Sequence, residues 1–272
     1  MRIALGIEYH GAAFCGWQAQ TSGCGVQDHI ERALAAFIGA SDARIPVICA
    51  GRTDTGVHAI AQVAHFDTAI VREPSSWVRG TNAFLRADVR VLWAANVPDT
   101  FHARFAARSR AYRYVLVNDP VEVALLQGAA GWFHAPLDLA AMQAASALLR
   151  GEHDFSAFRA AGCQAKSPIK TLYDVSIGRQ GQMIFFDFRA NAFLHHMIRN
   201  IVGTLVYLGA GRISIGEFSA LLLARDRALA PPTFAPDGLY FAAVEYDPSF
   251  NLPPFPHRHF LNHSLPSCAA PE

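Results

Sequence analysis

The chain has 272 residues, of which 52% are hydrophobic and 17% are charged, and its formal net charge is +1. This composition is that of a folded globular protein and excludes an intrinsically disordered chain, while the length suffices for one large domain or two smaller ones. No apolar run approaches the roughly 20 residues that span a bilayer, and the first residues lack a signal-peptide pattern, so we expect a cytoplasmic protein without a membrane segment.

The cysteines are five in number, widely spaced and without a C-x-x-C pair. Such a pattern indicates reduced thiols in a reducing compartment. We therefore expect neither a disulfide framework nor a structural zinc site.

Arginine dominates the basic residues, because Lys166 and Lys170 are the only lysines among 23 basic side chains. The planar guanidinium suits phosphate contacts and stacking on bases, although a biased genome composition produces the same excess. The net charge of +1 gives no sign of a polyanionic partner. Charge alone is therefore only weak support for nucleic-acid binding.

Periodicity in the first hundred residues predicts four strands and two helices in the order β-α-β-β-α-β. The expected strands are 2–9, 45–50, 60–67 and 89–97, and the helices are 26–38 and a second one opened by Pro74. This is the order of the split-βαβ, ferredoxin-like unit, in which two helices cover one face of an antiparallel sheet.

The second half repeats this plan. The expected elements are a strand at 111–118, a helix at 138–149, a hairpin of 170–178 with 182–190, helices at about 193–208 and 215–224, and a last strand at 239–246. We therefore predict an α+β fold of two ferredoxin-like units side by side, with mainly antiparallel sheets and a central RNA-binding cleft. The units are expected at 1–105 and 106–247, and a Pro- and His-rich tail at 248–272 is expected to be poorly ordered.

The segment from Gly51 to Ala59, GRTDTGVHA, places one carboxylate between two glycines directly after an apolar strand. Glycines permit turns that bring the backbone close to a ligand, so the segment suits presentation of Asp54 to a substrate. An aspartate that caps its own turn is the structural alternative. Because no second carboxylate lies nearby, a paired-acid mechanism is disfavoured, which leaves a covalent nucleophile or an acid that uses His58 as its base.

Residues of the second half can complete such a site. Arg199 interrupts an apolar helix, where a charge is costly unless paired, and the carboxylate of the glycine-framed segment is a suitable partner; an arginine that reaches solvent is the alternative. Tyr112 and Tyr114 share one face of a strand, where they can pack in a core or stack on an unstacked base. His195 and His196 are expected to point apart on that same helix, which argues against a metal site.

Seven motifs in order make the chain resemble the TruA family of tRNA pseudouridine synthases, over a stretch from about Leu5 to Tyr246. The strongest is the segment 51–59, and the others are FCGWQAQ at 14–20, FHARF at 101–105, YRY at 112–114, HDF at 153–155, the segment 193–203 and APDGL at 235–239. The chain departs from the family pattern at His10, Thr55 and Arg86, none of which belongs to the expected chemical groups.

The resemblance implies a role for each matching residue. Asp54 would be the nucleophile, Arg199 its ion-pair partner, and Tyr112 the ring that stacks on the target uracil. Arg52 would contact the RNA near the flipped nucleotide, and Leu239 would line the base pocket. Members of the family isomerise uridines at positions 38–40 of the tRNA anticodon stem-loop as homodimers, so tRNA and a second copy are the implied partners, and no cofactor or metal is implied.

Two other functions stay open at this point. A catalytically silent RNA-binding protein can use the same paired sheets, and a hydrolase can combine Asp54 with His58. The residues also leave open whether the carboxylate attacks C6 of the base or C1′ of the sugar.

Overall fold

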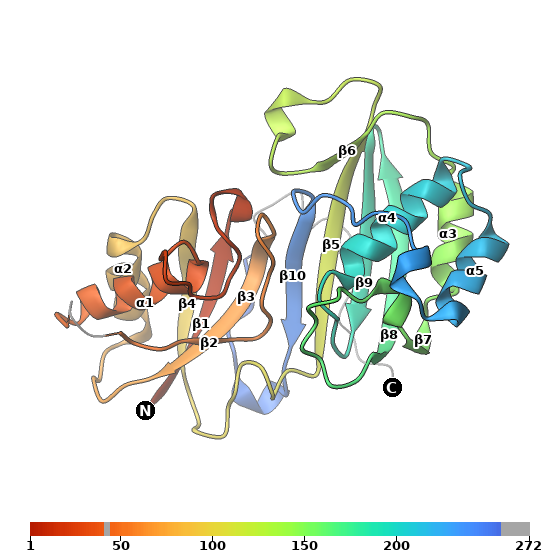
Figure 1. Cartoon of the computed structure of the whole chain (residues 1–272). Coiled ribbons are helices and arrows are strands. Elements are labelled where there is room, and N and C mark those ends of the chain that lie inside the picture. Colours follow the sequence, from red (N-terminus) through yellow and green to blue (C-terminus); the bar gives the residue numbers. More distant parts are fainter. Residues whose placement is uncertain (41–43, 257–272) are drawn as a thin grey trace. The chain divides into compact units, whose positions relative to one another are not determined.

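The structure is a computed structural model that describes residues 1–40 and 44–256 (Figure 1). Over these residues it is an α+β fold with five α-helices and mostly antiparallel strands, which confirms the predicted class. The chain forms two compact units. Of the described residues, the first unit contains 1–40, 44–108 and 240–256, and the second contains 109–239.

The first unit is built from five strands and two α-helices. They are β1 (Arg2–Tyr9), α1 (Val26–Phe37), β2 (Ile48–Cys49), β3 (His58–Asp67), α2 (Pro74–Phe84), β4 (Val89–Val97) and most of β10 (Leu239–Glu245). The strand order is β4-β1-β3-β10, and β2 also pairs with β3. β1 is antiparallel to both of its neighbours, whereas β10 runs parallel to β3. Helix α2 packs against α1 and β4.

Strand β3 is buried along its whole length except for its last residue. Three polar side chains are therefore inside the unit, and each one hydrogen-bonds the backbone of a different loop. His58 accepts from the N–H of residue 11, Gln62 bonds the peptide groups of residue 51, and His65 accepts from the N–H of residue 103. The strand thereby fixes three irregular segments, and one of them leads into Asp54.

The second unit has five strands and three α-helices. They are β5 (Ser109–Asn118), β6 (Gly131–Phe133), α3 (Leu139–Ala147), β7 (Gly151–Asp154), β8 (Ile169–Gln180), β9 (Met183–Ala190), α4 (Met197–Gly209) and α5 (Ile215–Ala224). The strands follow the order β5-β9-β8-β7, with β6 parallel to β5. Helix α3 packs against β8, α4 and α5, and Figure 1 shows these three helices gathered beside the strands.

The end of the chain differs in two ways from what the sequence predicted. The last strand, β10, was expected to close the second unit, but it pairs with β3 in the first. Within residues 248–256, Pro248–Phe250 form a short 3-10 helix, and two phenylalanine rings pack on aromatic rings of the first unit. The ring centroids of Phe250 and Phe101 lie 5.1 Å apart, and those of Phe255 and Trp93 lie 5.3 Å apart. The rest of the predicted tail, 257–272, lies outside the described residues.

A disulfide joins Cys15 to Cys24, so the prediction that all five cysteines are reduced is wrong. The intervening loop folds back on itself, with the N–H of Cys15 donating to the carbonyl of Cys24 at 3.1 Å. This brings the two Cα atoms to 5.5 Å, which is within the usual range for a disulfide. Spacing along the sequence does not reveal such a turn. Cys49 and Cys163 are free thiols.

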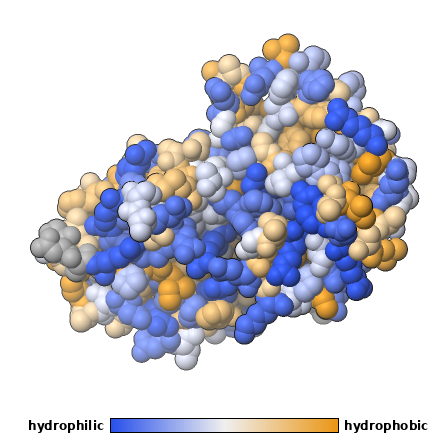
Figure 2. Space-filling view, in the orientation of Figure 1, coloured by the Kyte–Doolittle hydropathy of each residue, from blue (hydrophilic) through white to orange (hydrophobic). Residues whose placement is uncertain are grey.

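The exposed large apolar side chains are distributed over both units. Examples are Val71, Phe105, Leu125 and Leu223. Figure 2 shows hydrophilic and hydrophobic residues interspersed on the face in view, without one continuous apolar surface. Among the described residues, every helix is too short or too polar to cross a bilayer.

Candidate active site

Asp54 lies in the loop between β2 and β3, where the chain reverses direction. The N–H of Val57 donates to the carbonyl of Asp54 at 3.1 Å, and Gly56 has a φ of 80°, a left-handed conformation that favours glycine. The side chain of Thr53 is buried, that of Asp54 is half-buried, and that of Arg52 is exposed. The loop therefore presents one carboxylate at its turn, with a cation two residues before it.

The disulfide-closed segment packs tightly against this loop. The N–H of Trp17 donates to the carbonyl of Thr53 at 3.0 Å. Gly16 has a φ of 89°, and a Cβ on it would lie 2.7 Å from the same carbonyl oxygen and 3.1 Å from the carbonyl carbon of Asp54. Only a glycine permits so close an approach, so the backbone on both sides of the carboxylate is held by a neighbouring segment.

His58 has a structural environment. It is buried as the first residue of β3, and its Nδ1 accepts the N–H of Gly11 at 2.9 Å. The ring stacks on Tyr240 with centroids 4.6 Å apart and lies 4.5 Å from the ring of His10. Because Nδ1 already accepts a backbone N–H, these contacts favour a structural role for His58 over the role of general base for Asp54.

The two tyrosines of the YRY motif differ in their surroundings. Tyr112 on β5 is buried and meets the ring of Phe193 edge-on at 5.1 Å. Tyr114 is fully buried, donates its hydroxyl to the carbonyl of Ala235 at 2.9 Å and packs on Phe234. Tyr114 thus packs in the core and holds the segment that precedes β10, which is one of the two roles that the sequence allowed for these tyrosines.

Arg199, in the first turn of α4, is tied to the same segment. Its Nε donates to the carbonyl of Phe234 at 2.8 Å, and its own carbonyl accepts the N–H of Phe234 at 3.2 Å. The next residue, Asn200, is fully buried and bonds the hydroxyl of Thr233 at 2.7 Å and the carbonyl of Phe158 at 2.8 Å. The guanidinium is therefore engaged with the backbone instead of simply extending into solvent.

Leu239 is the third predicted site residue in the second unit. It is buried at the start of β10, directly after Gly238, whose carbonyl accepts the N–H of Val115 at 2.8 Å. Through these contacts, the strand that carries Tyr112 and the helix that carries Arg199 both meet the 234–239 segment. The structure thus places three predicted site residues on connected segments of one unit, and places Asp54 and Arg52 on one loop of the other.

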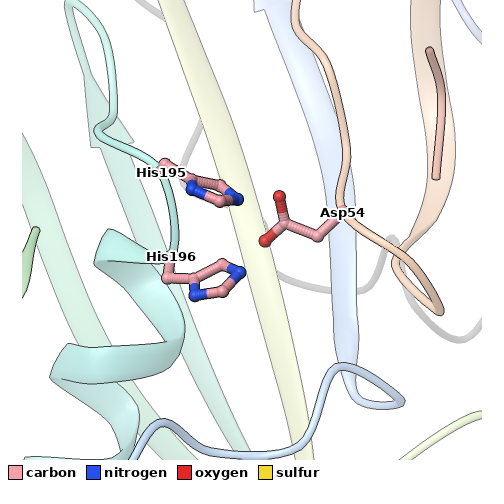
Figure 3. A group of neighbouring side chains, drawn as sticks. All are labelled: Asp54, His195 and His196. Atoms are coloured by element: carbon pink, nitrogen blue, oxygen red, sulfur yellow. The ribbon is translucent and has the colours of Figure 1, made fainter. Parts of the chain in front are cut away.

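His195 and His196 precede α4, so the prediction that they point apart on a helix is wrong. His196 caps the helix in a left-handed conformation with a φ of 59°, and the helix begins at Met197, four residues later than the periodicity indicated. The two rings lie 4.0 Å apart. Figure 3 shows both side chains on the segment that leads into α4, and it shows Asp54 on the loop that precedes β3.

The sequence did not single out Tyr9 and Gln62, whose buried side chains hold the Asp54 loop. A signal was present for Gln62, because an amide in the middle of the apolar strand IAQVA needs a hydrogen-bond partner. Tyr9 gave no such signal, since a tyrosine at the end of a strand is ordinary.

Comparisons with known proteins agree on one family. A family model described as tRNA pseudouridine synthase matches residues 6–106 and 145–247. Relatives named tRNA pseudouridine synthase A are 58% identical over 253 residues in Aromatoleum aromaticum, 57% over 256 in Burkholderia cenocepacia and 56% over 253 in Methylobacillus flagellatus. Each alignment covers 93% of this chain and between 93% and 96% of the relative.

These matches, together with the glycine-framed carboxylate, define the class of protein as an isomerase that acts on uridine in tRNA. The chain belongs to the tRNA pseudouridine synthase family. The resemblance that the seven sequence motifs indicated is thereby confirmed.

Proposed function

We propose that the protein converts uridine to pseudouridine at positions 38–40 of the tRNA anticodon stem-loop, with Asp54 as nucleophile and without a cofactor. In this isomerisation the bond from C1′ to N1 breaks, the uracil turns, and C5 bonds to C1′. The hydrogen on C5 is lost as a proton and N1 gains one, so no oxidant, reductant or group donor is required. The observation that carries the proposal is the segment 51–59, which matches the family and presents a single carboxylate at a tightly held turn.

A lone aspartate suits this reaction because one group must hold the base or the sugar while the glycosidic bond is open. Asp54 stands on a loop whose neighbouring peptide groups are hydrogen-bonded to the rest of the unit, so its direction is set before the substrate binds. Arg52, exposed two residues earlier, contacts the RNA backbone next to the displaced nucleotide.

The second unit supplies the groups that receive the base. Tyr112 offers its ring for stacking, and stacking on an aromatic side chain is worth about 1–3 kcal/mol, which offsets part of the unstacking cost of a few kcal/mol. Leu239 lines the pocket for the uracil. From the family resemblance we propose that Arg199 pairs with Asp54 and keeps the carboxylate ionised.

The fold and its assembly are proposed in the same way. Each unit is a ferredoxin-like split-βαβ unit; the antiparallel order β4-β1-β3 with β2 beside β3, and two helices packed together, supports this for the first unit. The protein works in the cytoplasm as a homodimer. Sedimentation of the purified protein with and without tRNA tests the dimer.

The direct test uses an anticodon stem-loop transcript that carries tritium at C5 of its uridines. We expect tritium release into water, pseudouridine at the expected positions on mapping, and an unchanged rate in EDTA. Asp54→Ala should give no product, whereas the matched control Asp88→Ala, which removes an acid in a surface ion pair with Arg86, should react like the wild type. RNA binding by the wild type without product would establish the silent binding protein instead, and product formation by Asp54→Ala would refute the nucleophile.

Two further variants test the other groups. Tyr112→Phe keeps the ring, so near-normal turnover assigns stacking alone to this residue, while Tyr112→Ala should lose most of the activity. Arg199→Ala should reduce activity more than stability, and Arg199→Lys should recover part of it because the charge is kept. An Arg199→Ala variant with full activity would rule out the proposed ion pair.

A further inference from the structure

Two buried, uncharged polar side chains, Tyr9 and Gln62, hold the Asp54 loop from neighbouring strands. Tyr9, the last residue of β1, is 4% exposed, and its hydroxyl lies 2.7 Å from the hydroxyl of Thr53. Gln62, on β3, is 0% exposed; its Nε2 donates to the carbonyl of Gly51 at 2.7 Å, and its Oε1 accepts the N–H of Gly51 over a longer 3.4 Å. Tyr9 and Gln62 thus hold two nearby positions of the same loop, residues 53 and 51.

Apolar residues would fill these positions at a lower desolvation cost. A buried hydroxyl or amide costs about 1–3 kcal/mol when its partner is lost, so this pair is stable only while the loop occupies its observed place. Several hydrogen bonds accordingly fix the backbone of the loop. Gly51 is bound at both its N–H and its carbonyl, and Thr53 is bound through its side chain by Tyr9 and through its carbonyl by Trp17.

We propose that Tyr9 and Gln62 are positioning residues for Asp54, which fix the peptide groups immediately before it and thereby the direction of its carboxylate. The inference rests on the proposed function in that Asp54 is the nucleophile. Neither side chain touches the substrate in this assignment. A misplacement of about 1 Å at a reacting group can cost about 100-fold in rate, so the loss of either anchor should lower kcat and leave KM for tRNA nearly unchanged.

The first experiment compares Tyr9→Phe with Tyr246→Phe by steady-state tritium release over a range of tRNA concentrations. Both variants remove a tyrosine hydroxyl that makes a 2.7 Å hydrogen bond in the same unit, but the hydroxyl of Tyr246 donates to the carbonyl of Ala103, away from the Asp54 loop. We expect Tyr9→Phe to lower kcat about 10- to 100-fold with KM within about twofold, and Tyr246→Phe to keep kcat, at similar losses in Tm. Equal effects of the two variants on kcat, or a change in KM alone, would overturn the proposal.

The second experiment uses the pH profile of Gln62→Glu. A protonated glutamic acid can donate to the carbonyl of Gly51 as the amide does, whereas a carboxylate repels it, and burial favours the neutral form. The kcat of this variant, relative to wild type, should therefore rise as the pH is lowered from about 8.5 to 6. The titratable groups of this region, Tyr9 and Cys49, stay neutral in this range, because burial raises the pKa of both, to about 12 for Cys49. The cations that face Cys49 are Arg52 and Arg104.

Variants of Thr53 keep the proposal testable if a Tyr9 variant does not fold. Thr53→Val removes the partner hydroxyl and should lower kcat as Tyr9→Phe does, whereas Thr53→Ser keeps the hydroxyl and should restore kcat. Asp54→Ala is measured in parallel. If Asp54→Ala is active, the proposed nucleophile fails; if it is inactive while Tyr9→Phe, Gln62→Glu and Thr53→Val all turn over like the wild type, the positioning role alone fails.

Discussion

His65 gives the first unit a pH-dependent stability that can be measured. Its side chain is 2% exposed on β3, and its Nδ1 accepts the N–H of Ala103 at 3.1 Å. Burial, reinforced by the charges of Arg2 and His102, lowers the pKa of His65 from 6.5 to about 4. The folded protein thus keeps this imidazole neutral at a pH where the unfolded chain has already bound a proton.

The sign and size of the effect follow from this difference. Above about pH 6.5 the imidazole is neutral in both states, and stability is unaffected. Between about pH 6.5 and 4 only the unfolded state takes up the proton, so the free energy of unfolding falls steadily as the pH is lowered. A gap of about 2.5 pKa units corresponds to about 3 kcal/mol in total, and the loss stops growing once both states are protonated.

Urea unfolding followed by tryptophan fluorescence between about pH 8 and 4 measures this loss. The control is His65→Asn, whose Oδ1 can accept the same N–H from Ala103 but does not titrate. Carboxylates and His102 titrate in both proteins, so their contributions cancel in the difference between the two curves. We expect the wild type to lose up to about 3 kcal/mol more than His65→Asn over this range. Parallel curves for the two proteins would refute the reasoning.

Three further predictions concern stability and the loop. Asp187→Asn breaks a buried pair in which Arg113 bonds both carboxylate oxygens at 2.6 and 2.8 Å; it should lower the free energy of unfolding in urea by about 3–5 kcal/mol, and an added Arg113→Met should recover much of this. Ser214→Ala removes the capping hydroxyl of α5, and urea unfolding should show a loss of about 1 kcal/mol. Gly16→Ala forces a side chain into a left-handed conformation against the Asp54 loop, so both Tm and kcat should fall; an unchanged kcat would show that the loop tolerates displacement.

Most regular elements were predictable because their signals are local. The bounds of β1, β4 and α5 coincide with those expected from periodicity. Helix α5 begins at a capping box in which Ser214 and Glu217 bond each other's backbone, and α2 begins with Pro74 in its first turn. These devices satisfy backbone groups within a few residues of themselves, so they act the same way in any tertiary context.

The errors arose where tertiary contacts decide the outcome. Leu194 extends the apolar stripe of α4 in sequence and is buried in the structure, but it lies in the loop before the helix. The apolar pattern therefore begins at a buried residue that lies before the first residue of the helix. The pairing of β10 with β3 and the disulfide between Cys15 and Cys24 likewise depend on segments that meet only in the folded chain.

The residues of the candidate site also divide into those with a local sequence signal and those that depend on tertiary contacts. Asp54 and Arg199 could be proposed as site residues from the sequence, because glycines mark the turn around Asp54 and because Arg199 is a charge among apolar residues that requires a partner. Tyr9 carries no such mark, and Gln62 is marked only as an amide in an apolar strand, because both side chains contact a loop that lies more than forty and ten residues away, respectively.

Strand β3 accounts for how a loop without regular structure can hold the Asp54 backbone in place. His58, Gln62 and His65 each bury a polar group that hydrogen-bonds the backbone of one particular loop. If any of these loops moved, both the side chain and the peptide group would lose a hydrogen bond in a place that water does not reach, at about 1–3 kcal/mol for each unsatisfied group. The strand therefore supplies much of the energy that keeps the Asp54 loop in its observed place.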